Sequence, residues 1–136
     1  MTAQTDRTAQ IAAYMASEGP LTPFQGEVPP SPEWFTRTVA VQPESAFVEV
    51  QGAKIHYLRW GDRAKPGLLL VHGNAAHAYW WSFIAPYLAK DYNVAAMDFS
   101  GMGDSGWRKN YSAEVFAEEQ LAVCEAAGMF AHSEPP

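Results

Sequence analysis

Residues 68–81 read LLLVHGNAAHAYWW and give the clearest indication of the fold. The first four residues form a short, continuous apolar run, which is typical of a strand covered on both faces of a sheet. Gly73 follows this strand after His72 and allows a sharp turn that presents the amide of Asn74. Ligands of open α/β sheets bind at this carboxyl edge. The stretch therefore predicts either a loop with a functional amide or a plain glycine turn held by a buried histidine.

Further strands are expected on either side of this run. Two segments rich in β-branched and aromatic residues precede this run, and a Gln-Gly-Ala turn joins them. This pattern indicates a pair of antiparallel strands. Another apolar run follows and ends at Asp98. The expected strands cover residues 47–50, 54–60, 68–71 and 93–97. Strands that alternate with helices after an antiparallel start predict an α/β sheet with one antiparallel end.

Two helices are expected within this region. Residues 78–89 show helical spacing, but Pro86 is compatible with a helix only in its first turn. Ser112 is a suitable N-cap for a second helix that reaches about residue 130. The apolar side of this helix would contain Ala117, Leu121 and Cys124.

The first 44 residues are expected to be separate from the sheet. Residues 5–18 carry a narrow apolar stripe and predict a short helix. Five prolines between positions 20 and 32 then favour an extended arm over a regular element. We therefore divide the chain into residues 1–44, the N-terminal helix and proline-rich arm, and residues 45–136, the α/β region.

Length and composition restrict the class of protein. A chain of 136 residues with 48% hydrophobic and 18% charged residues is typical of one globular domain. The net charge of −6 and the lack of a basic stretch argue against a nucleic-acid partner, and no apolar run is long enough to cross a membrane. Cys124 is the single cysteine, so we expect no internal disulfide and no metal site built from several thiolates, which suits a reducing cytoplasm. We expect a cytoplasmic protein without a cofactor, and we expect Cys124 to be buried and unreactive.

A second glycine-rich stretch, residues 98–106, reads DFSGMGDSG. Its G-x-G-x-x-G spacing matches a dinucleotide fingerprint, but no helix follows at once, and no acidic residue ends a second strand twenty positions later. The Gly-Asp-Ser-Gly run also occurs in protease nucleophile loops, which belong to an all-β architecture. We interpret the stretch as a tight glycine turn.

The two stretches together resemble the α/β-hydrolase superfamily. In that family the third strand ends in His-Gly, followed by an oxyanion loop and a tryptophan, and the fourth strand ends in Asp-x-Arg-Gly-x-Gly-x-Ser. Residues 72–81 and 98–105 follow this pattern, with Ser100 in place of the arginine that usually braces the turn and Ala75 where proline is frequent. The resemblance covers residue 45 to the end and implies a partial α/β-hydrolase sheet.

The resemblance also assigns roles to residues. The backbone N–H of Asn74 would be one oxyanion donor next to Gly73, and His72 would hold the loop. His77, Trp80 and Trp81 would line the mouth of a substrate pocket, with aromatic core packing as the alternative. The complete protein would hydrolyse an ester or similar small apolar substrate with a nucleophilic serine or aspartate. The Asn74 side chain also resembles the halide-binding asparagine of haloalkane dehalogenases, a less favoured alternative.

The nucleophile of the family is not found in this chain. No G-x-S-x-G elbow occurs, and GDSGW at residues 103–107 fails at its last position. The acid and base of the triad come later still in the family. No obvious nucleophile, base and acid relation is indicated by the spacing of the remaining candidates, His56, His72, His77, His132, Asp98 and Ser105. We therefore expect a truncated hydrolase fragment that is inactive alone, or alternatively a non-catalytic remnant or interaction module.

The strand of residues 68–71 is expected to have an open edge. The family strand order 1-2-4-3-5 would place it between the strand of residues 93–97 and a fifth strand that this sequence lacks. No lysine or proline interrupts the apolar run. An open apolar edge pairs readily with another chain, so self-association is expected there.

Overall fold

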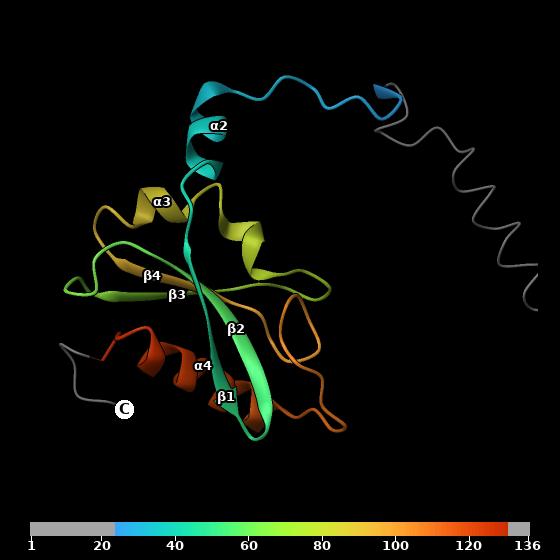
Figure 1. Ribbon diagram of the computed structural model, residues 1–136, viewed down its shortest axis with the longest axis vertical. Coiled ribbons are helices and arrows are strands. Elements are labelled where there is room, and N and C mark those ends of the chain that lie inside the picture. The colour runs from blue at the N-terminus through green and yellow to red at the C-terminus, as the bar shows by residue number, and fades with distance from the viewer. Residues whose placement is uncertain (1–23, 131–136) are drawn as a thin grey trace, which may run out of the picture. The chain divides into compact units, whose positions relative to one another are not determined.

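The computed structural model describes residues 24–130, in which one mixed sheet has helices on both faces (Figure 1). The chain from Pro32 onward forms one compact unit, and residues 24–31 belong to another. The strands are β1 (Glu44–Val50), β2 (Ala53–Trp60), β3 (Gly67–Val71) and β4 (Asn93–Met97). The helices are α2 (Glu33–Val39), the 3-10 helix η2 (Ala78–Trp81), α3 (Ala85–Leu88) and α4 (Ala113–Ala126).

The order of the strands is β1-β2-β4-β3. The pairs β1/β2 and β2/β4 are antiparallel, whereas β3 and β4 are parallel, with Leu69 opposite Ala95. This arrangement confirms the expected α/β sheet with one antiparallel end. Within the described part of the chain, no strand pairs with the second edge of β3.

The sheet buries a different apolar cluster on each face. All five residues of β4 are buried, as a continuous apolar strand inside a sheet requires. Alternation along the strands then divides the side chains between the faces. The α4 face contains Val50, Ala53, Ile55, Tyr57, Ala95, Met97, Val123 and Ala127. The face with η2 and α3 contains Leu58, Trp60, Ala78, Ala85, Val94 and Ala96.

The helices that follow β3 are short. Pro86 lies in the first turn of α3, where its missing N–H costs no helical hydrogen bond, and the segment is divided into η2 and α3. This confirms the limit that Pro86 was expected to set on residues 78–89.

The expected N-cap of α4 is correct, but the expected apolar side is wrong. The Ser112 hydroxyl accepts a hydrogen bond from the Val115 N–H at 3.3 Å. Ala117 is exposed and Leu121 is 50% exposed, whereas Glu119 and Val123 are the buried residues of the helix. A buried ion pair of Glu119 determines which side of α4 faces the sheet. The apolar pattern of the sequence does not reveal this ion pair.

Helix α2 was not expected, since it lies within the residues assigned to the proline-rich arm. Pro32 occupies its N-cap position, where a proline breaks no helical hydrogen bond, and residues 27–32 before it have no regular structure. Phe35 of α2 stacks on Phe83, with ring centroids 6.4 Å apart. The expected helix at residues 5–18 lies outside the described residues.

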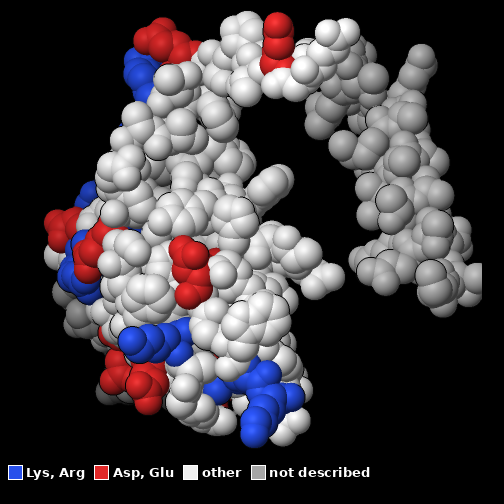
Figure 2. All heavy atoms as spheres, turned by 45° about the vertical axis from the view of Figure 1, so that its right-hand side comes forward, with Lys and Arg blue, Asp and Glu red and all other residues white. Residues whose placement is uncertain are grey.

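The surface of the sheet region carries charges of both signs. On the face shown in Figure 2, lysine and arginine side chains lie in small groups with aspartate and glutamate nearby.

In the stretch from residue 24 to residue 130, no helix has the length and apolar character needed to cross a membrane.

Candidate functional site

The carboxyl ends of β3 and β4 deliver two chain segments to one edge of the sheet. Because β3 and β4 are parallel neighbours, the segment after Val71 and the turn after Met97 begin side by side. The Ala78 N–H donates to Asp98 Oδ1 at 2.6 Å, and the Phe99 N–H donates to His72 Nε2 at 3.3 Å. The two stretches that carry the sequence motifs are therefore hydrogen-bonded to each other.

His72 lies at the join of these segments and is only 6% exposed. Its Nε2 accepts from the Phe99 N–H, so in the neutral ring Nδ1 carries the proton and donates to the Gly73 carbonyl at 2.7 Å. The ring also packs edge-on against Phe99, with centroids 5.5 Å apart. This side chain fixes the start of the loop to the glycine turn after β4.

The loop after His72 is exposed at Gly73, Asn74 and Ala75. The sharp turn was expected at Gly73, but the left-handed backbone belongs to Ala75, with φ of 56°. Gly73 is outside that region, and a Cβ built on it would meet nothing within 4 Å. Within residues 24–130 the Asn74 N–H has no hydrogen-bond partner, so this amide is available to a ligand.

Asp98 is fully buried and organises the turn after β4. Its Oδ2 accepts from His56 Nδ1 at 2.7 Å and from the Asp104 N–H at 3.1 Å, in addition to the bond from Ala78 to Oδ1. Burial is the largest single influence on the pKa of Asp98 and raises it. The hydrogen bonds from His56, Ala78 and Asp104 lower this pKa, and together they outweigh burial. The pKa of Asp98 is therefore below its usual value.

Glycines are required in the turn itself, as expected. Gly101 and Gly103 have φ of 80° and 50°, which other residues rarely adopt. A Cβ at residue 103 would also overlap the Asp98 carboxyl group. Residues 107–112 separate this turn from α4, so its glycines do not open a helix as those of a dinucleotide fingerprint do.

The structure brings the side chains of two of the sequence candidates, a histidine and an aspartate, into contact. It brings His56 of β2 against Asp98, and the Ser45 hydroxyl lies 2.9 Å from His56 Nε2. Ser105 is also near, but it donates to the Asp98 carbonyl at 2.7 Å and accepts from the His56 N–H at 2.8 Å. Ser45 was missed because only the register of β1 on β2, with Phe47 opposite His56, brings it there.

A buried ion pair braces the glycine turn where the family has an arginine. Glu119 of α4 accepts from the Ser100 N–H at 3.0 Å and from Arg108 Nε at 2.9 Å. Arg108 also donates to the carbonyls of Val50 and Gln51, at the turn between β1 and β2. The brace expected to be lost at Ser100 is therefore supplied by Arg108 through Glu119.

An apolar pocket of about 540 Å³ lies beside η2. His77 and Trp80, both expected at a pocket mouth, line it, and Trp80 is 62% exposed. Trp81 instead packs against the buried cluster on the face with η2 and α3. Seven aromatic or apolar side chains form most of the lining, namely Trp34, Phe35, Val39, His77, Tyr79, Trp80 and Phe83. We call this the aromatic pocket.

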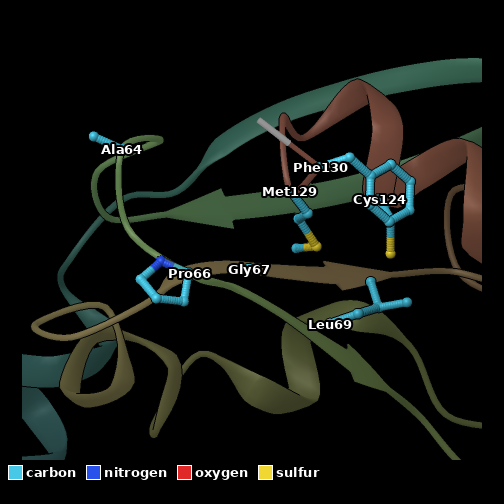
Figure 3. A pocket seen from close by; sticks show the side chains of 7 residues that line it. All are labelled: Ala64, Pro66, Gly67, Leu69, Cys124, Met129 and Phe130. Carbon is cyan, nitrogen blue, oxygen red and sulfur yellow. The ribbon is translucent and has the colours of Figure 1, made fainter. Parts of the chain in front are cut away.

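A second pocket, of about 500 Å³, lies between β3 and the end of α4 (Figure 3). Leu69, Cys124 and Met129 line it, and the Cys124 sulfur points toward Leu69. It begins at Gly67, the amino end of β3, and is therefore distant from the loop at the carboxyl edge. Cys124 is half-buried rather than fully buried, and burial raises the pKa of its thiol, which disfavours the reactive thiolate.

One group of described residues has the composition of a metal site. His56, Asp98 and Asp104 offer ligand atoms that lie within 4.8 Å of one another. Asp98 Oδ2, however, already accepts hydrogen bonds from His56 and from the Asp104 backbone. These bonds account for the cluster without a metal ion.

Comparison with known proteins agrees with this architecture. A family model described as alpha/beta hydrolase fold matches residues 66–129. Epoxide hydrolase 4 of Homo sapiens is 27% identical over 84 residues, and epoxide hydrolase 3 of Xenopus tropicalis is 28% identical over 121 residues. The crystal structure of epoxide hydrolase A from Mycobacterium thermoresistibile is 26% identical, with a TM-score of 0.59 over 64% of this chain and 28% of that one. With its sheet order and its two motifs, the chain belongs to the α/β-hydrolase superfamily.

The chain matches only part of these relatives. The alignment with human epoxide hydrolase 4 covers 60% of this chain and 23% of that protein. The alignment with Xenopus tropicalis epoxide hydrolase 3 covers 86% of this chain and 33% of that protein. It therefore spans about a quarter to a third of the length of the curated relatives it matches.

Proposed function

We propose that this chain is the oxyanion-loop part of an α/β hydrolase whose complete form hydrolyses a small apolar ester or epoxide by nucleophilic catalysis. The proposal rests mainly on the exposed Asn74 amide, which has no partner within residues 24–130 and follows directly from β3. An amide fixed at the carboxyl edge can stabilise the negative charge that develops on a substrate oxygen. Ester substrates follow from the family resemblance, and epoxides from the names of the similar hydrolases.

The surrounding residues would position that amide. His72 ties Gly73 to the turn after β4, and Asp98 holds Ala78 at the far end of the loop. Both ends of the loop are thus fixed to buried groups, which preorganises the amide before a substrate binds. The aromatic pocket, with His77 and Trp80 on its wall, would receive the apolar part of the substrate. No cofactor takes part in this proposed reaction.

The nucleophile would come from outside this chain. The direct test joins residues 32–130 to the remaining part of the Mycobacterium thermoresistibile epoxide hydrolase, which provides a complete domain. A fused protein that melts cooperatively should hydrolyse an aryl epoxide or a p-nitrophenyl ester. A folded fusion that hydrolyses neither would contradict the proposal and favour the alternative of a non-catalytic interaction module.

The 136-residue chain alone should show no repeated, steady-state turnover of p-nitrophenyl acetate above buffer. The family elbow is absent, so for turnover by the family mechanism at most the weak acceleration from oxyanion and binding groups is left. Saturable turnover that disappears in Ser105→Ala would contradict this expectation. The hydrogen bond of Ser105 to the Asp98 carbonyl instead supports a structural role.

A further inference from the structure

Ser45, His56 and Asp98 form a continuous hydrogen-bonded chain across β1, β2 and the end of β4. Ser45 Oγ lies 2.9 Å from Nε2 of His56, and Nδ1 of the same ring lies 2.7 Å from Asp98 Oδ2. An ionised carboxylate can only accept, so in the neutral imidazole Nδ1 carries the proton. Nε2 is then the acceptor of the Ser45 hydroxyl. This is the tautomer that a general base for a serine requires.

We propose that Ser45 is a nucleophilic serine that accepts an acyl group from a carboxylic ester, with His56 as its general base. Ser45 is exposed and can meet a substrate, whereas the side chains of His56 and Asp98 are each 1% exposed. Exclusion of water strengthens the bond between base and carboxylate. Asp98 is a positioning residue in this arrangement, because it acts through His56. The site is distinct from that of the proposed function, which takes its nucleophile from outside this chain.

The hydroxyl of Ser105 serves as an internal comparison. It lies near the same histidine, but its proton is donated to the Asp98 carbonyl, and it contacts the His56 backbone rather than the ring. Ser105 is also buried. The geometry thus points to Ser45 and not Ser105 as the serine whose proton a base can take.

The neighbouring side chains indicate the class of ester. The Tyr79 ring stacks beside His56, with centroids 6.2 Å apart and an interplanar angle of 24°, and it also lines the aromatic pocket. The Phe47 ring, two residues from Ser45 on β1, lies 5.1 Å from the His56 ring and is 53% exposed. An ester with an aromatic or alkyl group fits these surroundings better than a charged one.

The proposed step is a single acyl transfer. Ser45 Oγ forms a bond to the carbonyl carbon while its proton passes to His56 Nε2. The ester C–O bond then breaks, and the leaving alkoxide takes its electron pair and receives the proton from His56. The products are an acylated Ser45 and a free alcohol, and the imidazole returns to its neutral form.

A fluorophosphonate with an alkyl tail tests this step on the 136-residue chain. Ser45 Oγ would form a bond to phosphorus, the P–F bond would break, and fluoride would leave with the electron pair while His56 takes the proton and releases it to water. Peptide mapping by mass spectrometry should find one phosphonyl group, at Ser45. Ser45→Ala should abolish the labelling, and His56→Gln should slow it about 100-fold. Ser31→Ala, which removes an exposed serine outside this hydrogen-bonded chain of side chains, should leave the rate unchanged.

Labelling that persists in Ser45→Ala, or an unchanged rate in a folded His56→Gln variant, would overturn the proposal. Since His56 is buried, its substitution can unfold the chain, so Ser45→Cys provides a second measurement with the base intact. At pH 6 the new thiol should react with iodoacetamide at least about tenfold faster than free cysteine, because a neighbouring imidazole lowers thiol pKa values. A rate equal to that of free cysteine would also contradict the proposal.

Discussion

At the scale of single residues, Asp98 connects most parts of the carboxyl edge. Its two oxygens hold the loop at Ala78, the ring of His56 and the glycine turn at Asp104. The motif indicated that an aspartate ends this strand, but it did not reveal His56 as its partner. That contact depends on the pairing of β2 with β4, which places Tyr57 opposite Met97.

Acid should weaken the fold through Asp98. Its pKa is lowered in the folded chain, so its contribution to stability is complete above the unfolded value of about 3.9 and is lost as the pH falls through the folded pKa. Urea unfolding between pH 6 and pH 3 should show a falling free energy of unfolding, with a smaller fall in Asp98→Asn. Glu44→Gln is the exposed comparison, because the hydrogen bond from Arg59 also lowers the Glu44 pKa while solvent screens that pair. Equal pH dependence in Asp98→Asn and the wild type would contradict this role.

At the scale of secondary structure, the strands could be predicted and part of the helical structure could not. The apolar run of β3 and the β-rich segments of β1 and β2 carry their periodicity in the sequence, and Pro86 indicated the limit on α3. The prolines before Glu33 concealed α2, although a proline at the N-cap does not prevent a helix. The burial of Glu119 could not be predicted, because Arg108 reaches it from a loop rather than from a helical spacing.

The pair of Arg108 and Glu119 should be important for docking α4 on the sheet. Both side chains are shielded from solvent, at 8% and 0% exposure, so removal of one leaves the other charge buried without its partner. Arg108→Met should lower the free energy of unfolding by about 3–5 kcal/mol, measured by urea titration. Arg37→Met removes the exposed pair with Glu33 and should cost less than about 0.5 kcal/mol. Similar losses in the two variants would show that the buried pair does not fix α4.

At the scale of the whole molecule, the chain presents an α/β-hydrolase sheet with one unpaired edge among its described residues. The expected order of the first four strands is correct, so β3 lies beside β4 and its second edge faces no strand in the part of the chain that the structure describes. Its relatives are three to four times as long as the matched region. The remaining length of such relatives is where we expect the nucleophile and further strands.

Self-association through the β3 edge is the prediction at this scale. The open N–H and C=O groups of Gly67–Val71 can pair with another chain, and no charged side chain lies within the strand to oppose this. Size-exclusion chromatography should show larger species as the concentration rises, and the melting temperature should depend on concentration. A monomer with a concentration-independent melt would show that this edge is protected.

The role of the Asn74 amide is the central claim, and backbone substitution tests it most directly. In the fused hydrolase domain, Asn74→Pro removes the N–H, whereas Asn74→Ala keeps it and removes only the side chain. The measurement is kcat for a p-nitrophenyl ester in the two variants, with cooperative melting required of both. We predict that Asn74→Pro lowers kcat about 100- to 1,000-fold, the effect of removing one oxyanion donor, and that Asn74→Ala stays close to the unsubstituted fusion. Equal kcat in the two folded variants would contradict the claim that this amide stabilises the transition state.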